Sequence, residues 1–300
     1  MKLFREILII CLLGKLIACS PLASGEINDV WGHKQVATVE MAGSDSVWVC
    51  HLSMLKDTVT VPLSYFVEEL EMVKLDNRDA ALVSSSKTII GKQYILVHKM
   101  GHVPFKLFTK SGTYLRDIGS FGQGAGEYGL AYDAQMDEEN NRFYVLCWQA
   151  DHILVFDLQG NILQPIRLAH WSPKGVFHVE TERGRVHVCA LSFNRDFVGD
   201  RHSPMIWTQS LDGKIIKELP AGYLAVNDYA NEIKSLNNGT VMDIGFWFGG
   251  QYRNDSLYHY NNQEFRLVPR FTLDYGGHEL TPHSFGELPN HFWGENMNIS

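Results

Sequence analysis

The sequence lacks most of what would build a helical or nucleic-acid-binding protein. Beyond its N-terminal leader, apolar residues rarely recur at the three-to-four-residue spacing of an amphipathic helix, and the segment 223–236 is the single helix-like candidate. Its 26 Lys and Arg residues are outnumbered by 34 Asp and Glu residues, which leaves a formal net charge of −8. Because nucleic-acid affinity requires clustered Lys and Arg, we expect no nucleic-acid partner.

Disulfides, metal centres and bound cofactors lack the motifs that usually mark them. The 5 cysteines include no Cys-x-x-Cys pair, and the 13 histidines include no His-Glu-x-x-His pattern. Cys50, Cys147 and Cys189 lie inside apolar strands, so we predict that they are buried small hydrophobic residues. The glycines at 122–126 are followed by another strand rather than by the helix that a nucleotide loop needs. We therefore predict no metal and no cofactor.

The N-terminus has the features of an export signal. Lys2 and Arg5 precede a short apolar run at residues 7–13, which is too short to cross a bilayer as a helix. The Leu-Ile-Ala-Cys sequence that ends at Cys19 resembles the lipobox of bacterial lipoproteins, although the charge of Lys15 departs from that pattern. The resemblance implies that Cys19 is lipidated and becomes the mature N-terminus.

We accordingly divide the chain into a lipoprotein signal peptide at 1–19, a tether at 20–33 and one folded domain at 34–300. The domain would be anchored to a bacterial membrane through lipid alone and would face the periplasm or the cell surface. An ordinary secretory signal and an uncleaved anchor remain alternatives.

The folded part repeats a strand, a tight polar turn and a second strand. The turns contain Ser-Gly, Gln-Gly-Asn, Asp-Gly and Asn-Asn, which tolerate the positive φ angles of short hairpins. Their centres lie about 50 residues apart, close to the period of propeller blades, and a further strand pair precedes each hairpin. The four segments are 105–115, 153–163, 206–216 and 257–267. This pattern predicts an all-β fold, a β-propeller of four-stranded antiparallel blades.

Residues 105–168 resemble NHL repeats. Such repeats have a Gly-x-Gly-x-Gly-x-aromatic link before an Asp-containing strand and a hydrophobic-Phe-Asp strand. Here the link spans 122–128, the Asp is Asp133 and the last strand ends at Asp157, with Ala125 where the motif usually has Pro. The resemblance implies an NHL-like propeller.

More closely, residues 34–275 resemble the six-bladed β-propeller lipoproteins of Bacteroidetes, most clearly through 61–71 and 104–108. Six blades at this period need about 300 folded residues, more than remain after the leader. Residues 286–300 do not have the pattern of a closing strand. We therefore expect a shortened member whose ring is incomplete or closed by fewer blades.

In such a propeller, the loops between the second and third strands of each blade and the links between blades gather on one face. Here these loops carry aromatic side chains together with Arg, His and Gln donors, which suit a ligand with apolar faces and polar edges. The alternative is that the aromatic residues only pack the loops. The candidate ligand-binding residues are Trp148, Gln149, His152, Arg195, Arg201, His202, Trp247, Tyr252 and Arg253.

The sequence thus predicts a non-catalytic cell-envelope binding protein that holds a glycan, a peptide or a protein on the loop face. One alternative is a metal-dependent propeller hydrolase or lyase, for which Asp133, Glu180 and Asn231 are the oxygen ligands nearest the expected inner strands. A structural assembly subunit is the other. No catalytic residue is predicted, and fold alone decides nothing among these functions.

Overall fold

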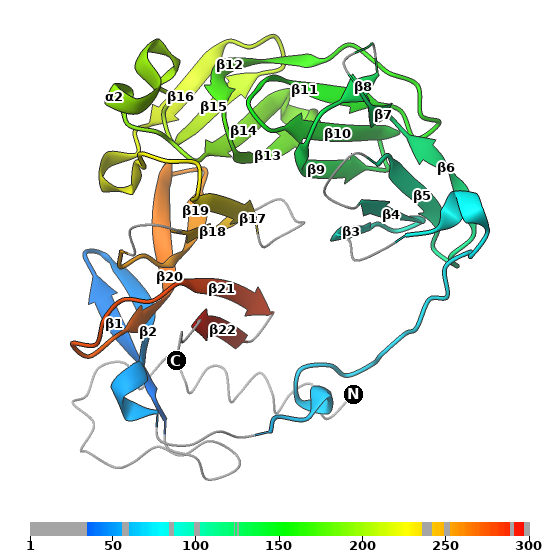
Figure 1. Cartoon of the computed structure of the whole chain (residues 1–300). Helices are drawn as coiled ribbons and strands as arrows, with labels where there is room; N and C mark the ends of the chain where they lie inside the picture. The colour runs from blue at the N-terminus through cyan, green and yellow to red at the C-terminus, as the bar shows by residue number, and fades with distance from the viewer. Residues whose placement is uncertain are drawn as a thin grey trace.

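The chain folds as an all-β propeller whose blades stand side by side in an arc, with one strand of each blade toward the axis (Figure 1). No helix in the described part of the chain has the length and apolar character needed to cross a membrane. The signal peptide, the tether, Cys19 and Tyr252 lie outside the described residues. The computed structural model describes residues 35–55, 60–83, 87–98, 103–122, 124, 126–235, 242–248, 253–288 and 291–296.

Blades 1 and 2 are antiparallel sheets whose strands follow the chain order from the axis outward. Blade 1 consists of β3 (Lys87–Ile90), β4 (Tyr94–His98), β5 (Phe105–Thr109) and β6 (Tyr114–Ile118). Blade 2 consists of β9 (Ala131–Asp137), β10 (Arg142–Cys147), β11 (Ala150–Phe156) and β12 (Ile166–Ser172).

Blades 3 and 4 repeat this order. Blade 3 consists of β13 (Gly175–Glu180), β14 (Arg185–Ala190), β15 (Ile206–Ser210) and β16 (Ile215–Leu219). Blade 4 consists of β17 (Glu232–Ser235), β18 (Asp243–Trp247), β19 (Leu257–Asn261) and β20 (Arg266–Asp274).

The remaining elements are two further hairpins, a short parallel pair and short helical turns. The N-terminal hairpin adds to blade 4, because β2 pairs in parallel with β20. The hairpins are β1 (Ala37–Ala42) with β2 (Asp45–His51) and β21 (His283–Leu288) with β22 (His291–Asn296), and the pair is β7 (Ser120–Phe121) with β8 (Glu127–Tyr128). The helical turns are α2 (Arg195–Val198) and the 3-10 turns Leu52–Met54, Leu63–Tyr65, Asp79–Ala81, Thr181–Arg183, Gly199–Arg201 and Gly222–Leu224.

The outer hairpin turns of blades 1 to 3 are structural equivalents, as the sequence predicts. Gly112, Gly160 and Gly213 have φ angles of 90°, 91° and 89°. In each turn the glycine N–H donates to the carbonyl three residues earlier, at 2.9, 3.0 and 3.0 Å. The side chain of that earlier residue accepts a second backbone N–H of the turn. The turns therefore form through the same local chemistry three times.

Strand alternation gives every blade two apolar faces, and each face packs against a neighbour. In β10 and β11 of blade 2, Phe143, Val145 and Phe156 point to blade 1, whereas Leu146 and Ile153 point to blade 3. Corresponding clusters lie between blades 3 and 4 and between blade 4 and the β21–β22 hairpin. Burial of about 25 cal/mol per Å² of apolar surface between sheets is the main stabilising term of this arrangement.

The outer face of blade 1 is covered by an irregular segment rather than by another blade. We call residues 60–83 the strap. Val73, Leu75 and Ala81 of the strap pack on β4 and β5, at Val97 and Phe108 among others. The strap also donates Asp76 N–H to the Gly112 carbonyl at 2.8 Å. At its other end, the Tyr65 and Phe66 rings contact His291 of β22.

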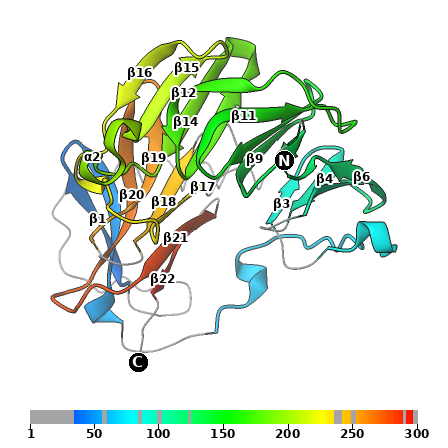
Figure 2. The ribbon, with the colours of Figure 1, turned by 45° about the horizontal axis from the view of Figure 1, so that its top comes forward.

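The arc is open between β22 and β3, and the strap runs along this open side (Figures 1 and 2). Residues 286–300 do contain a strand, because β22 pairs with β21 over the whole hairpin, but among the described residues this strand does not close the ring. Gly286 lies opposite Trp293 there, and a side chain at Gly286 would collide with the indole ring. The described residues thus give four complete blades and one two-stranded unit.

Two other predictions concern a helix at 223–236 and the burial of three cysteines. The helix-like candidate at 223–236 is wrong, because this region contains a 3-10 turn and then β17. Cys189 is buried as predicted, whereas Cys50 and Cys147 are half-buried, and all three are free thiols.

Gly112 and Gly213 provide a matched test of the strap. Both have φ near 90°, so replacement by Ala should cost about 1–2 kcal/mol of unfolding free energy at either site. The added Cβ would lie 2.2 Å from the Lys74 carbonyl oxygen at Gly112, but 3.4 Å from the Arg167 oxygen at Gly213. Gly112→Ala should therefore lose at least about 1 kcal/mol more in urea unfolding. Equal losses would mean that the strap does not pack on this turn.

Candidate functional site

The loops of blades 2, 3 and 4 meet on one face, as the propeller pattern predicts. Backbone N–H groups of Trp148 and Gln149 donate to carbonyls of the links that enter blades 2 and 3, at Leu130 and Pro173, both at 2.8 Å. The Trp148 ring lies edge-on to the ring of Tyr229, with centroids 6.1 Å apart. We call this side of the molecule the loop face.

Four candidate residues on the loop face are exposed. Trp148 is 41% exposed, and Gln149 beside it adopts a φ of 56° in the tight turn between β10 and β11. His152, at the start of β11, contacts the carboxylate of Asp151 at 2.5 Å. Arg195 is the first residue of α2. These side chains are available to a ligand.

Three other candidates have contacts within the protein. The Arg201 guanidinium lies over the Trp171 ring at 4.8 Å, and His202 Nδ1 contacts the Phe193 carbonyl at 2.7 Å. Arg253 donates to the carbonyls of Tyr223 and Ala225 and lies over the Phe248 ring. Trp247 is half-buried at the end of β18, and its Nε1 is buried without a hydrogen-bond partner. These contacts of Arg201, His202 and Arg253 therefore hold the loops in place.

A buried ammonium group ties blades 2, 3 and 4 together beneath the loop face. Lys174 Nζ donates to the carbonyls of Tyr229 and Asn231, at 2.7 and 2.8 Å, and to Glu232 Oε1 at 2.6 Å. The other oxygen of Glu232 accepts the hydroxyl of Tyr132, which comes from blade 2. All three protons of the ammonium group are thus satisfied, which a buried charge requires.

Tyr132 reaches blade 4 because the β9–β10 pairing shifts register between Leu146 and Cys147. Such a β-bulge re-aims one side chain. The Tyr132 hydroxyl also contacts the backbone of Ile233, 101 residues away, at 3.1 Å from its oxygen and 3.3 Å from its nitrogen. Sequence reasoning did not find Lys174, Tyr132 or Glu232, because these contacts join blades far apart in the chain.

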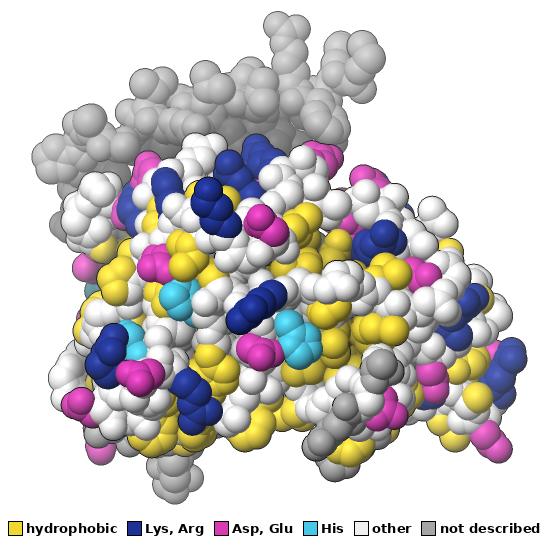
Figure 3. All heavy atoms as spheres, turned by 90° about the horizontal axis from the view of Figure 1, so that it is seen from above, with side chains coloured by type: hydrophobic (Ala, Val, Ile, Leu, Met, Phe, Trp, Pro, Cys, Tyr) yellow, Lys and Arg dark blue, Asp and Glu magenta, His cyan; other side chains and the backbone are white. Residues whose placement is uncertain are grey.

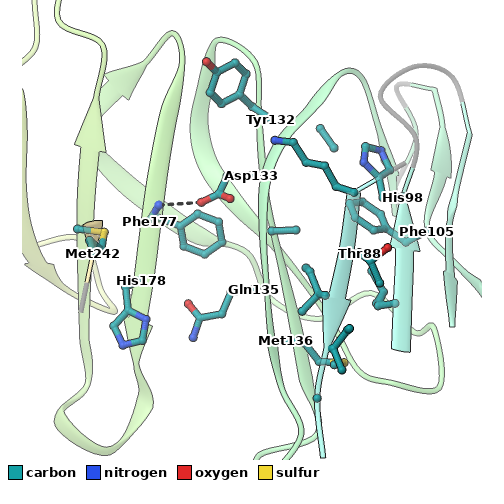
Figure 4. A pocket seen from close by; sticks show the side chains of 17 residues that line it. Thr88, His98, Phe105, Tyr132, Asp133, Gln135, Met136, Phe177, His178 and Met242 are labelled. Atoms are coloured by element: carbon teal, nitrogen blue, oxygen red, sulfur yellow. Dashed lines mark hydrogen bonds between the residues drawn. The ribbon is translucent and has the colours of Figure 1, made fainter. Parts of the chain in front are cut away.

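A cavity of about 340 Å³ lies between the inner strands β3, β9 and β13. Its volume is within the range of small-ligand sites. Tyr132 stands at its upper end and Met136 at its lower end, with His178 and Gln135 between them (Figure 4). We call this cavity the inter-blade cleft. It is lined by Lys87, Thr88, Ile89, Ile90, Gly91, Leu96, His98, Phe105, Ala131, Tyr132, Asp133, Ala134, Gln135, Met136, Phe177, His178 and Met242.

Among the described residues, side chains of β9 hydrogen-bond the backbone of β13 but not that of β3. On the blade 3 side, Gln135 Oε1 accepts the Val179 N–H at 2.8 Å and its Nε2 donates to the Val179 carbonyl at 3.2 Å. Asp133 Oδ2 accepts the Phe177 N–H at 3.0 Å (Figure 4). On the blade 1 side, Glu138 bonds the backbone of the β3–β4 turn, below the cleft. The strands β3 and β9 are thus left apart along their length.

Asp133 and His98 are two of the titratable groups of the cleft whose pKa values are shifted. Burial raises the pKa of the Asp133 carboxyl to about 6. His98 is 6% exposed, stacks on Phe105 with ring centroids 4.0 Å apart, and has an Nε2 that meets no hydrogen-bond partner among the described residues. Burial and then the charge of Lys87 lower the pKa of His98 to about 4. His98 is therefore neutral and Asp133 largely ionised at pH 7.

The residues considered for a metal-dependent enzyme have different surroundings. Asp133 lines the cleft, but Glu180 pairs with His187 at 3.3 Å, and the Asn231 amide bonds Asp228. Neither Glu180 nor Asn231 lines the cleft. Among the residues that the structure describes, no group of three His, Cys, Asp or Glu side chains is arranged to hold a metal ion.

The comparisons with known proteins give a family and a fold. The family described as "Domain of unknown function (DUF4934)" matches residues 48–297, and no curated protein matches the chain. A predicted exported protein of Bacteroides fragilis is similar in structure, with 17% identity and a TM-score of 0.51, over 76% of this chain and 61% of that chain. The chain thus spans about three-fifths of that protein's length, and the likeness shows the fold alone.

Two further structures match over much of the chain. One is a member of the DUF4221 family from Bacteroides vulgatus, with 9% identity and a TM-score of 0.41, over 73% of this chain and 66% of that one. The other is the β-propeller domain of Cps50 (Swd1) from Myceliophthora thermophila, with 11% identity and a TM-score of 0.35, over 68% of each chain.

Removal of the Lys174 charge should loosen three blades at once. Lys174→Met keeps the side-chain stem but leaves Glu232 and two carbonyls without their donor, so unfolding free energy should fall by about 2 kcal/mol or more. The matched control Lys214→Met alters an exposed lysine in the β15–β16 turn. It should change the unfolding free energy by less than about 0.5 kcal/mol. Urea unfolding of the two variants makes the comparison. Equal stability would contradict a structural role for Lys174.

Proposed function

The chain belongs to the DUF4934 family, and we propose that this member is a non-catalytic binding protein of the cell envelope. It would hold a glycan, a peptide or a protein on the loop face of its propeller. Trp148, Gln149, His152 and Arg195 are exposed in the loops of this face. Aromatic rings with polar donors suit a ligand that has apolar faces and polar edges.

The inter-blade cleft is the observation that carries this proposal. It combines apolar side chains such as Phe105 and Phe177 with a few polar groups that converge on one space, which is typical of ligand sites. Tyr132 lines its upper end and is bonded to the network beneath the loop face. A ligand that enters from the loops could therefore place one group in the cleft.

The outer edge of the blades does not carry charge of one sign. On the face of the molecule seen in Figure 3, Lys and Arg side chains are interspersed with Asp and Glu side chains. An extended polyanion would meet charges of both signs there. Recognition by specific groups, rather than by net charge, is the mode that this surface supports.

We place the protein in the cell envelope because its N-terminus has the features of an export signal. The Bacteroides fragilis protein of similar fold is also a predicted exported protein. Lipid attachment at Cys19 is part of the proposal. The NHL-like character of the repeats and a six-bladed ancestry also belong to the proposal. In that ancestry, the strap takes the place of a neighbouring blade that would cover blade 1.

One observation favours a second candidate, a metal-dependent hydrolase or lyase. The carboxyl of Asp133 stands in a cleft with a raised pKa, and such groups often serve in catalysis. Calcium bound at a one-to-one ratio in the purified protein would favour this enzyme. A calcium content near zero would favour the binding protein.

The loop face can be tested with matched tryptophan variants. Trp148→Ala removes an exposed ring from the loop face, and Trp48→Ala removes an equally exposed ring, 41% in each case, from β2. On glycan and peptide arrays, Trp148→Ala should weaken binding by about tenfold or more, because a buried interface aromatic contributes about 2 kcal/mol. Trp48→Ala should bind as the wild type does.

Trp247→Ala tests the half-buried ring at the end of β18 in the same assay. Unchanged binding in both Trp148→Ala and Trp247→Ala would reject the loop face as the ligand site.

The anchor can be tested by growth with radiolabelled palmitate. The wild-type chain should incorporate label and fractionate with membranes, and Cys19→Ala should do neither, since several acyl chains are needed for stable attachment. Label in Cys19→Ala equal to that in the wild type would exclude Cys19 as the attachment site.

A further inference from the structure

The upper half of the inter-blade cleft contains a carboxylate that no cation neutralises at contact distance. One oxygen of Asp133 is fixed by the Phe177 N–H. Asp133 belongs to no ion pair within 4 Å among the described residues; burial raises its pKa, and the more distant charge of Lys87 opposes that rise. A partly desolvated carboxylate of this kind gains most from a ligand that brings a positive charge.

The other titratable groups around Asp133 are two neutral imidazoles and one charged ammonium group, that of Lys87, which lines the cleft and acts on both Asp133 and His98. From blade 1 they are Lys87, which is exposed on β3, and His98 on β4. From blade 3 the group is His178 on β13, whose pKa is lowered by burial. Both imidazoles are therefore uncharged near pH 7.

We propose that the inter-blade cleft binds the α-amino end of a peptide, with the ammonium group on the Asp133 carboxylate and the first side chain among Phe105, Phe177 and Leu96. This inference rests on the proposed binding function and names its ligand class. An ammonium group offers three donors, which the Asp133 carboxylate can accept. The apolar lining then receives the side chain that follows.

A peptide end suits this site better than a neutral sugar does. Sugar hydroxyls can donate to a carboxylate, but they leave its charge without a counter-charge. A hydrogen bond between two charged groups is roughly twice as strong as one between neutral groups. The lower half of the cleft, with Ile89 and Met136, adds apolar surface.

The proposed contact has a distinctive pH dependence. Below about 6 the Asp133 carboxyl becomes protonated and loses the charge that attracts the ammonium group, so affinity should fall as the pH falls. Above about 8 the α-amino group of the ligand loses its own proton, so affinity should fall again. A peptide should therefore bind best between these values. A neutral oligosaccharide would show no loss at the alkaline end.

The experiment compares three probes by fluorescence titration of the full chain. They are a library of tripeptides with free amino ends, the same library acetylated at the N-terminus, and a set of neutral oligosaccharides. Wild-type protein should bind the free tripeptides at least about tenfold more tightly than the acetylated ones, because a charge-assisted hydrogen bond contributes about 1.5–3 kcal/mol.

Asp133→Asn is the informative variant, since its amide oxygen can still accept the Phe177 N–H. It should lose about tenfold or more in affinity for free tripeptides and should lose the acidic limb of the pH profile. Glu182→Gln makes the same carboxylate-to-amide change at an exposed position in the β13–β14 turn and should bind as the wild type does. Thermal unfolding of each variant shows that it is folded.

The outcomes separate the two proposals. Equal binding of free and acetylated tripeptides, or binding of oligosaccharides alone, would overturn the peptide-end proposal and leave the binding function in place. Unchanged affinity of a folded Asp133→Asn variant for free tripeptides would also overturn the peptide-end proposal and leave the binding function in place. Binding of none of the three probes would contradict both the peptide-end proposal and the proposed function.

Discussion

The structure depends on one constraint, which is that a four-stranded sheet has two apolar faces and cannot cover either of them itself. In blade 1, Leu96 and Leu107 on one face pack against blade 2, and Val97 and Phe108 on the other pack under the strap. Blades 2 and 3 have a neighbouring sheet on each side. The strap therefore does for blade 1 what a further blade would do in a closed ring, and an open arc can bury its core without closure.

The same constraint positions the site. Side chains of β9 bond the backbone of β13, so the inner strands of blades 2 and 3 are held together. On the other side of β9, contacts to blade 1 lie deeper in the sheets and at the lower turn, which leaves a cleft beside the axis. Tyr132 and Lys174 fix the upper end of this cleft to blade 4. Packing between blades thus creates a preformed cavity between the inner strands β3, β9 and β13.

Local chemistry made much of this fold predictable from the sequence. The turns at Gly112, Gly160 and Gly213 follow from neighbouring residues, and so do the strands on either side of each turn. The β21–β22 hairpin was missed because its pairing around Gly286 depends on a facing tryptophan rather than on alternation. The cleft and the Lys174 network were missed for another reason. They join residues more than forty positions apart, whose proximity is set only when the blades pack.

Hydrogen exchange, followed peptide by peptide, tests most directly whether coverage of both faces holds each blade together. Val73→Ala combined with Leu75→Ala removes strap side chains from the outer face of blade 1. We expect faster exchange in β4 and β5 of this variant, and unchanged exchange in β10 of blade 2 and β14 of blade 3. Unaltered exchange in β4 and β5 would show that the strap does not complete blade 1, and would contradict the account.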